Sequence, residues 1–156
     1  MNILSEEQAA ARQLVLPRDG LVEGLTPEFI AELQSAGAFV EYNQQIIVPA
    51  GEFIEFLSCI VAGRVKISRL DADYRKAQVG TLAAGQWFGE TSLFLRTRSS
   101  AEFFADKEVV IWTIPPDQLR DMFFRKPRAV QLLYNIGTLL ARRVTARNQE
   151  RNATAL

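Results

Sequence analysis

The sequence contains no histidine, and this absence excludes several kinds of chemistry. Histidine is the general base of Ser-His-Asp triads, the side chain that titrates near neutral pH, and a common ligand of zinc and haem iron. Only carboxylate or lysine catalysis remains, and no paired acids or metal-ligand clusters stand out in the sequence. We therefore expect no catalytic residue, no metal site and no cofactor, and a protein that is not an enzyme.

Cysteine is almost as scarce, because Cys59 is the one cysteine among 156 residues. A single cysteine forms neither an intrachain disulfide nor a multi-cysteine iron–sulfur site. Cys59 lies in the apolar run at residues 56–61, and apolar surroundings keep a thiol protonated and unreactive. We expect a buried, inert thiol at this position.

Long apolar runs and an excess of charge of one sign are also missing. No window holds the roughly 20 consecutive apolar residues that span a bilayer. The first seven residues lack the positive flank and apolar stretch of a signal peptide. Basic and acidic residues number 18 each, so no overall field attracts nucleic acid or acidic lipid. We expect a soluble, cytoplasmic protein that does not bind a membrane.

The first part of the chain, residues 1–37, carries two signals for the start of a helix. Ser5 and Gln8 have the spacing of a capping box, in which each side chain accepts a hydrogen bond from the other residue's backbone N–H. Thr26 followed by Pro27 has the pattern of an N-cap and a first-turn proline. We expect an N-terminal helical segment here.

The rest of the chain changes from strand to helix patterns. Residues 38–114 consist of short apolar segments separated by glycine, proline and aspartate, which predicts the closely spaced strands of a β-barrel or jelly roll. Trp87 and Trp112 have apolar neighbours in this region, and we expect both in the core. Residues 115–150 have helical periodicity, and residues 151–156 form a tail. We expect one domain overall, mainly β with flanking helices.

The last predicted helix carries an apolar stripe with three- and four-residue spacing. Two interpretations remain open: the stripe packs on its own domain, or it pairs with a second copy of the chain. The length of this helix favours a homodimer. The residues of the stripe are Leu132, Leu133, Ile136, Leu139, Leu140 and Val144.

The most informative motif lies at residues 88–94, with residues 98–101 just behind it. Gly89 lets the backbone approach an anion closely, and a short helix that begins at Glu90 directs backbone N–H groups toward it. Arg98 can add a charge-assisted hydrogen bond. A carboxylate accepts hydrogen bonds but does not donate them, so Glu90 fits a sugar hydroxyl better than a phosphate. The combination suits a cyclic nucleotide.

These residues also resemble a known family. The series Gly80, Gly85 and Phe88-Gly89-Glu90, followed by residues 98–101, resembles the phosphate-binding cassette of cyclic-nucleotide-binding domains, such as those of catabolite activator proteins and protein kinase A regulatory subunits. The similarity runs from about residue 34 to residue 147, with the cassette at residues 85–101. It implies an eight-stranded jelly roll, or double-stranded β-helix, with N-terminal helices and a long C-terminal helix.

The resemblance also implies which residues bind the ligand. Glu90 would accept from the ribose hydroxyl, and the backbone N–H groups nearby and the second arm of the cassette would bind the phosphate. Family members often place an arginine nine residues after this glutamate, where this chain has Ser99; a one-residue slip would bring Arg98 to that place. Both options remain open. The residues of this implied site are Gly89, Glu90, Thr91, Ser92, Arg98, Ser99 and Ser100.

Two residues of the last helix complete the implied site. Arg147 and Asn148 fall near the positions at which activator-type relatives contact the base. Arginine at this place would stack on a base or hold a second phosphate, which favours an alternative ligand such as cyclic di-GMP. The other interpretation is a solvated end of the helix.

We therefore expect a regulatory sensor domain that binds cAMP or another cyclic nucleotide in signal transduction. Binding would shift the helices of residues 115–150 and relay the signal to a protein effector in trans. The alternative is a ligand-free domain that has lost its phosphate clamp and serves in dimerisation or protein interaction. Few residues follow the last helix, so we expect no winged-helix module and no direct DNA binding.

Overall fold

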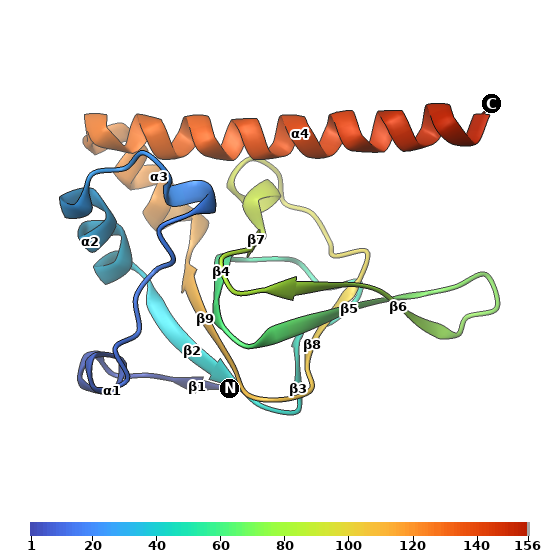
Figure 1. Ribbon diagram of the computed structural model, residues 1–156, viewed down its shortest axis with the longest axis horizontal. Coiled ribbons are helices and arrows are strands. Elements are labelled where there is room, and N and C mark those ends of the chain that lie inside the picture. The colour runs from blue at the N-terminus through green and yellow to red at the C-terminus, as the bar shows by residue number, and fades with distance from the viewer. Residues whose placement is uncertain (156) are drawn as a thin grey trace.

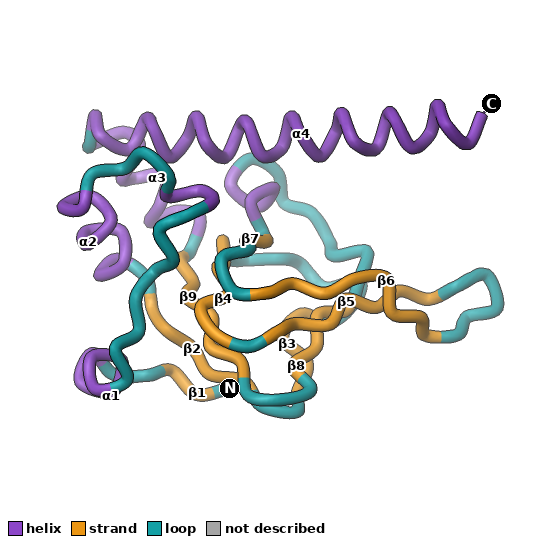
Figure 2. Tube along the Cα trace, in the orientation of Figure 1, coloured by secondary structure: helices purple, strands orange, loops and turns teal. Residues whose placement is uncertain are grey.

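The chain folds into two β-sheets with α1 and α2 at the left and α3 at the upper left, and the long α4 lies across the top of the molecule (Figures 1 and 2). The structure is a computed structural model that describes the backbone of residues 1–155 and the side chains of residues 1–152. Leu156, the last residue of the predicted tail, lies outside the described residues.

The N-terminal segment contains the two predicted helices. Helix α1 (Glu6–Ala11) begins with the capping box, since Ser5 Oγ accepts from the Gln8 N–H at 3.1 Å and Gln8 Oε1 accepts from the Ser5 N–H at 2.8 Å. The short η1 (Gly20–Val22) and α2 (Pro27–Ala36) follow, and Thr26 caps α2. Both predictions of helix starts are confirmed.

The strands form two antiparallel sheets, and the predicted fold class is confirmed. One sheet has the order β1-β2-β9-β4-β7 and the other the order β3-β8-β5-β6. Eight strands lie within residues 38–114, and β1 pairs with β2 at the edge as a ninth. The strands are β1 (Asn2–Ile3), β2 (Ala38–Tyr42), β3 (Gln45–Val48), β4 (Leu57–Ala62), β5 (Arg64–Leu70), β6 (Lys76–Ala83), β7 (Trp87–Phe88), β8 (Glu102–Ala105) and β9 (Val109–Ile114).

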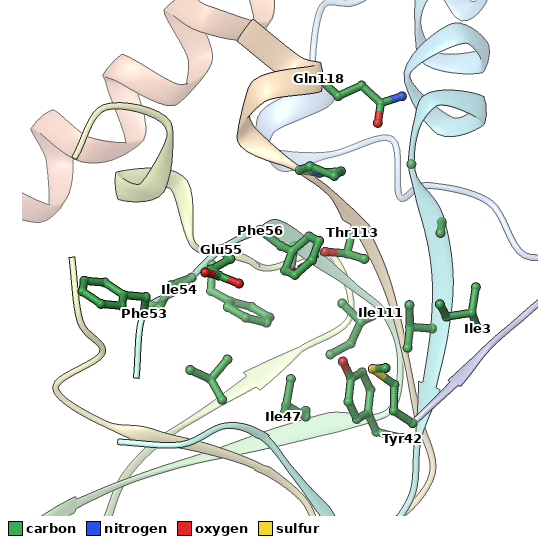
Figure 3. A pocket seen from close by; sticks show the side chains of 18 of the residues that line it. Ile3, Tyr42, Ile47, Phe53, Ile54, Glu55, Phe56, Ile111, Thr113 and Gln118 are labelled. Atoms are coloured by element: carbon green, nitrogen blue, oxygen red, sulfur yellow. Dashed lines mark hydrogen bonds between the residues drawn. The ribbon is translucent and has the colours of Figure 1, made fainter. Parts of the chain in front are cut away.

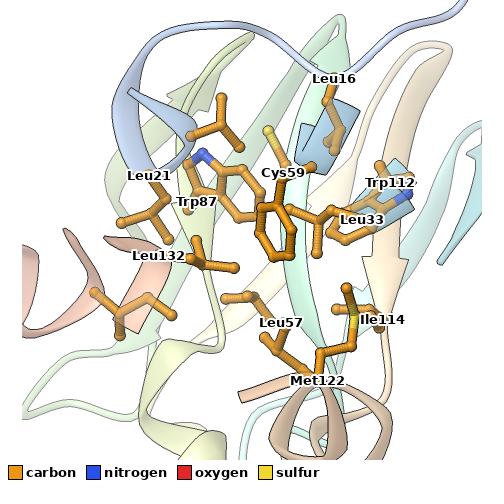
Figure 4. Close-up of a cluster of buried hydrophobic side chains, with 14 of the residues drawn as sticks. Leu16, Leu21, Leu33, Leu57, Cys59, Trp87, Trp112, Ile114, Met122 and Leu132 are labelled. Carbon is orange, nitrogen blue, oxygen red and sulfur yellow. The ribbon is translucent and has the colours of Figure 1, made fainter. Parts of the chain in front are cut away.

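The first sheet packs on two cores because its side chains alternate between its faces. On the outer face, Trp112, Trp87 and Cys59 are buried against the helices (Figure 4). The two indole rings meet edge to face with centroids 5.9 Å apart. On the inner face, Ile111 and Phe88 pack inside the roll, where Phe88 stacks on the ring of Phe103. The predicted core positions of both tryptophans and of Cys59 are confirmed.

The C-terminal helices are α3 (Pro116–Arg125), the short η3 (Pro127–Ala129) and α4 (Val130–Ala155). Helix α4 continues past residue 150, so the predicted start of a tail at residue 151 was wrong. No glycine or proline follows residue 150 to end the helix. Among the described residues, no helix combines the length and the hydrophobicity needed to cross a membrane.

The apolar stripe of α4 divides between two faces. Leu132 and Ile136 are fully buried, and Leu139 and Leu140 pack partly on the same core, so the stripe does pack on its own domain. A second row at three- and four-residue spacing leaves apolar side chains in solvent. Its exposed members are Val130, Leu133 and Val144. Pairing with a second copy stays a prediction.

Candidate functional site

The first arm of the cassette is the sharp turn from β7 into η2 (Glu90–Leu93). Gly89 caps η2 with a left-handed backbone, φ 83°. A Cβ at this position would collide with the carbonyl oxygen of Phe56, which belongs to the loop before β4. Gly89 is therefore required both by its backbone conformation and by close packing.

Glu90 is the central polar group of this turn. Its side chain is only 3% exposed, and its Oε1 forms an ion pair with a guanidinium nitrogen of Arg143 in α4. Its Oε2 is buried and has no hydrogen-bond partner. A buried acceptor without a donor costs free energy, and the cost is larger for a charged group. The carboxylate is thus half satisfied, with one oxygen paired and the other buried without a donor.

Arg143 joins the cassette to the C-terminal helix. Besides the ion pair with Glu90, its Nη2 donates to the carbonyl oxygen of Trp87 at 3.2 Å. Burial, together with the nearby charge of Arg147, lowers the pKa of the Arg143 guanidinium from its ordinary value. One side chain of α4 therefore holds both ends of the turn at residues 87–90.

The remaining residues of η2 hold the turn in shape. Ser92 is buried, and its hydroxyl donates to the Gly89 carbonyl at 2.5 Å. The carbonyl of Thr91 accepts from the N–H groups of Phe94 and Leu95 at 3.0 and 2.9 Å. At the start of such a helix, the N–H groups of Glu90 and Thr91 have no carbonyl partner within the helix. They remain available to an anion.

The second arm of the cassette is residues 97–101, which lie along the loop that precedes β4. The Ser99 N–H donates to Glu52 O and its carbonyl accepts from the Gly51 N–H, both at 2.8 Å. Ser99 is buried, and its hydroxyl donates to Ala101 O at 2.6 Å. The adjacent Ser100 is exposed. The two serines therefore present different groups, a buried hydroxyl and a solvent-facing one.

Arg98 is exposed and engages this loop. Its Nη1 donates to Gly51 O at 2.9 Å, and its guanidinium carbon lies 4.2 Å from the ring centroid of Phe53. Arg96 approaches the same ring at 4.1 Å. In this conformation Ser99 occupies the inward position, and the one-residue slip that would turn Arg98 inward is not observed.

Arg147 and Asn148 lie on the exposed part of α4, one turn beyond Arg143. Four residues separate Arg143 from Arg147, so the two guanidinium groups lie on the same side of the helix. The charge of Arg147 contributes to the lowered pKa of Arg143. Arg147 therefore lies close enough to Arg143 for its charge to act on the partner of Glu90.

A cavity of ≈ 620 Å³ runs along α4 beside this pair. Its borders include Arg142, Arg143 and Trp87, whose buried indole N–H has no hydrogen-bond partner. These three side chains only donate hydrogen bonds, so the wall next to the Glu90–Arg143 pair offers donors to a ligand, whereas Glu23 elsewhere on the border accepts. None of the nine residues of the predicted site borders this cavity.

Arg143 is the functional residue that sequence reasoning missed as a site residue. The sequence places it 53 positions after Glu90, within a helix end that reads as solvated. Sequence reasoning gave Glu90 a ribose hydroxyl as its partner, so it did not look for a cationic side chain elsewhere in the chain. Among the residues whose side chains are described, no cluster of three or more acids or cysteines could hold a metal ion.

Comparison with known proteins agrees with this geometry. Residues 42–126 match the family model described as a cyclic nucleotide-binding domain. Glutaminase 2 of Bradyrhizobium diazoefficiens is 33% identical over 135 residues, which are 85% of this chain and 21% of the glutaminase. A CRP-like cAMP-activated global transcriptional regulator of Mycobacterium tuberculosis is 27% identical over 135 residues, 86% of this chain and 59% of the regulator.

The fold has a close counterpart among solved structures. The catabolite activator protein of Thermus thermophilus superposes with a TM-score of 0.78 at 24% identity, over 86% of this chain and 62% of that chain. The chain spans less than two thirds of the length of each of these three relatives. With the family model matched over more than half of the chain, the chain belongs to the cyclic nucleotide-binding domain family.

Proposed function

We propose that this domain binds a cyclic nucleotide at Glu90 and passes the occupancy of that site to α4 through Arg143. The observation that carries the proposal is the half-satisfied carboxylate of Glu90. One oxygen is ion-paired to α4 and the other is buried without a donor. A ligand hydroxyl that reaches this oxygen is therefore coupled to the helix by a single side chain.

The ribose of a nucleotide supplies the missing donor. A 2′-hydroxyl that donates to Glu90 Oε2 satisfies a buried charged acceptor, and hydrogen bonds to charged groups contribute about 1.5–3 kcal/mol. The N–H groups of Glu90 and Thr91 and the second arm at Ser99 and Ser100 would meet the cyclic phosphate. The ligand we propose first is cAMP, because the regulator of Mycobacterium tuberculosis is described as cAMP-activated.

The output of the site would be a change at α4. We expect the ligand to bind with different affinity when the Glu90–Arg143 pair is formed and when it is broken. The ligand then favours the position of α4 that belongs to the state it binds more tightly. The exposed row at Val130, Leu133 and Val144 would then be offered to a second copy or to a protein effector in trans. The role is regulatory and non-catalytic, in the cytoplasm.

Two alternatives have support of their own. The second arm favours a ligand-free interaction domain. The Ser99 hydroxyl already donates a hydrogen bond to Ala101 O and Arg98 is turned toward Phe53, so neither side chain is directed at a phosphate. Cyclic di-GMP is favoured by Arg143 and Arg147, two like charges on one side of α4 that a second phosphate would neutralise.

Isothermal titration calorimetry against cAMP, cGMP and cyclic di-GMP tests the proposal. We expect one of the three to bind with a Kd in the micromolar range or tighter, and Glu90→Gln to weaken it at least tenfold. The matched control is Glu41→Gln, which removes a glutamate of β2 that is paired with Arg12. Absence of heat with all three nucleotides would refute the proposal and favour the ligand-free alternative.

A further inference from the structure

A second cavity lies on the inner side of the first sheet, next to the start of the cassette at Phe88. It measures ≈ 530 Å³ and is bordered by the inner face of the first sheet, by β3 and by the loop before β4 (Figure 3). None of the nine residues of the nucleotide site borders it. Its volume is within the range of about 300–1,000 Å³ that is typical of small-molecule pockets.

The walls of this cavity are mostly apolar because they are the inward side of the strands. Val40, Ile111 and Phe88 project from β2, β9 and β7, and Ile47 faces them from β3. Phe88 and Ile111 also pack in the buried cluster inside the roll. This packing holds them in place, so they do not move together to fill the space. An apolar cavity of this kind gains free energy when apolar surface fills it.

Hydroxyl groups provide a small number of polar points. Ser58 and Thr113 lie side by side on adjacent strands, with their hydroxyl oxygens 3.1 Å apart, and Thr113 donates to Leu57 O at 3.4 Å. Ser58 then donates to Thr113, which leaves its own oxygen free to accept a hydrogen bond. The Tyr42 hydroxyl points into the cavity from the opposite end (Figure 3). Burial raises the pKa of Tyr42, so this hydroxyl stays neutral.

Few charged groups border the cavity. Among the described residues, Glu55 is the one acidic or basic side chain that borders it. The other charged group is the amino group of Met1, which already donates to Gln45 Oε1 at 2.8 Å. The guanidinium groups of Arg96 and Arg98 lie on the ring of Phe53, so the ring separates them from the cavity. The wall of the cavity is therefore mostly apolar, which suits an uncharged ligand.

We propose that this cavity is a second ligand site, for an uncharged, mainly apolar small molecule that carries one hydrogen-bonding group, such as an alcohol or a ketone. The apolar body lies against Ile47, Val40 and Ile111. The polar group bonds to the Tyr42 hydroxyl or to the oxygen of Ser58.

The site has a direct connection to the cassette. Phe88 borders the cavity and immediately precedes Gly89. Ile54 and Phe56, which also border it, are the two residues against which Gly89 packs. A ligand that moves this loop therefore moves the turn that carries Glu90, and binding at the two sites is coupled.

Fluorescence titration with N-phenyl-1-naphthylamine, an uncharged apolar probe, tests the site. We expect saturable binding of one probe per chain with a micromolar Kd. Ala38→Phe, which places a ring in the cavity from β2, should weaken binding at least tenfold. The matched control Ala77→Phe makes the same change at an exposed position of β6 and should leave the Kd within twofold.

A second measurement does not depend on the folding of a variant. In methyl-region NMR spectra of the unaltered protein, the probe should shift the signals of Ile47, Val40 and Ile111 and leave that of Val144 in place. Binding without saturation, equal binding by Ala38→Phe and Ala77→Phe, or shifts confined to exposed methyl groups would overturn the proposal. The probe titration is done without any nucleotide, so failure at this cavity is distinct from failure of the nucleotide site.

Discussion

Arg143→Met is expected to destabilise the domain more than Glu90→Gln, because the two partners of this ion pair differ in burial. The Glu90 side chain is 3% exposed, whereas that of Arg143 is 47% exposed. Loss of the arginine leaves a carboxylate in the protein interior without a counter-charge. Loss of the carboxylate leaves a guanidinium that water can reach. Methionine keeps the apolar stem of arginine, so the comparison isolates the charge.

The magnitudes follow from this asymmetry. Removing one partner of a fully buried pair costs about 3–5 kcal/mol, and the exposure of Arg143 sets the lower end, about 3 kcal/mol. Glu90→Gln should cost about 1–2 kcal/mol, because an amide fills the same space without charge. The double variant should resemble Glu90→Gln alone, since no charge is then stranded. The coupling free energy of the cycle then equals the cost of Arg143→Met, about 3 kcal/mol.

Urea unfolding followed by circular dichroism measures all four proteins of the cycle. In thermal unfolding, Arg143→Met should lower Tm by about 6–12 °C, since 1 kcal/mol corresponds to about 2–4 °C in a domain of this size. The reasoning would be refuted by additive single effects, or by a larger loss in Glu90→Gln than in Arg143→Met. Either result would mean that Arg143 does not compensate the Glu90 charge in solution.

Three further predictions concern other parts of the molecule. Gly89→Ala should lower the free energy of unfolding, measured in urea, by at least about 3 kcal/mol. Gly51→Ala should lower it by about 1 kcal/mol, because Gly51 has a φ of 84° but open space where its Cβ would lie. Equal losses would contradict the collision with Phe56. Burial, with a contribution from Asp19, raises the pKa of Cys59 to about 12, so the folded chain keeps this proton after the unfolded thiol has lost it above about pH 8.5. The free energy of unfolding of the unaltered protein, relative to that of Cys59→Ala, should then fall as pH rises from about 8 to about 11. A difference between the two proteins that does not change with pH would contradict the raised pKa. In analytical ultracentrifugation, Val144→Glu should convert a dimer to a monomer, and the control Thr145→Glu should not. An unaltered protein that is already monomeric would contradict pairing through α4.

Local chemistry made much of the fold predictable. The cap at Ser5 involves residues three positions apart, and Thr26 with Pro27 acts within one turn, so neither depends on distant parts of the chain. The alternation of Trp112 with its neighbours in β9 follows from the period of a strand. The end of α4 was misjudged because polar composition was read as a tail, although none of those residues breaks a helix.

The site depended more on the tertiary structure. Glu90 and its glycine were visible in the sequence because the turn is local. Whether Arg98 or Ser99 faces inward was not, since the choice depends on the pairing of residues 97–99 with the loop at residues 51–54, far away along the chain. A one-residue change of register reverses which side chain is buried.

By itself, the sequence determined the order of helices and strands, the polarity of each face, and the chemistry that the missing histidines exclude, because these depend on residue type and short spacing. The tertiary structure decided that Arg143 meets Glu90, that one carboxylate oxygen lacks a donor, and that an apolar cavity remains inside the roll. Each of these requires the docking of α4 or the closure of the two sheets. Contacts between segments this far apart along the chain follow from packing of the whole domain, which no local pattern encodes.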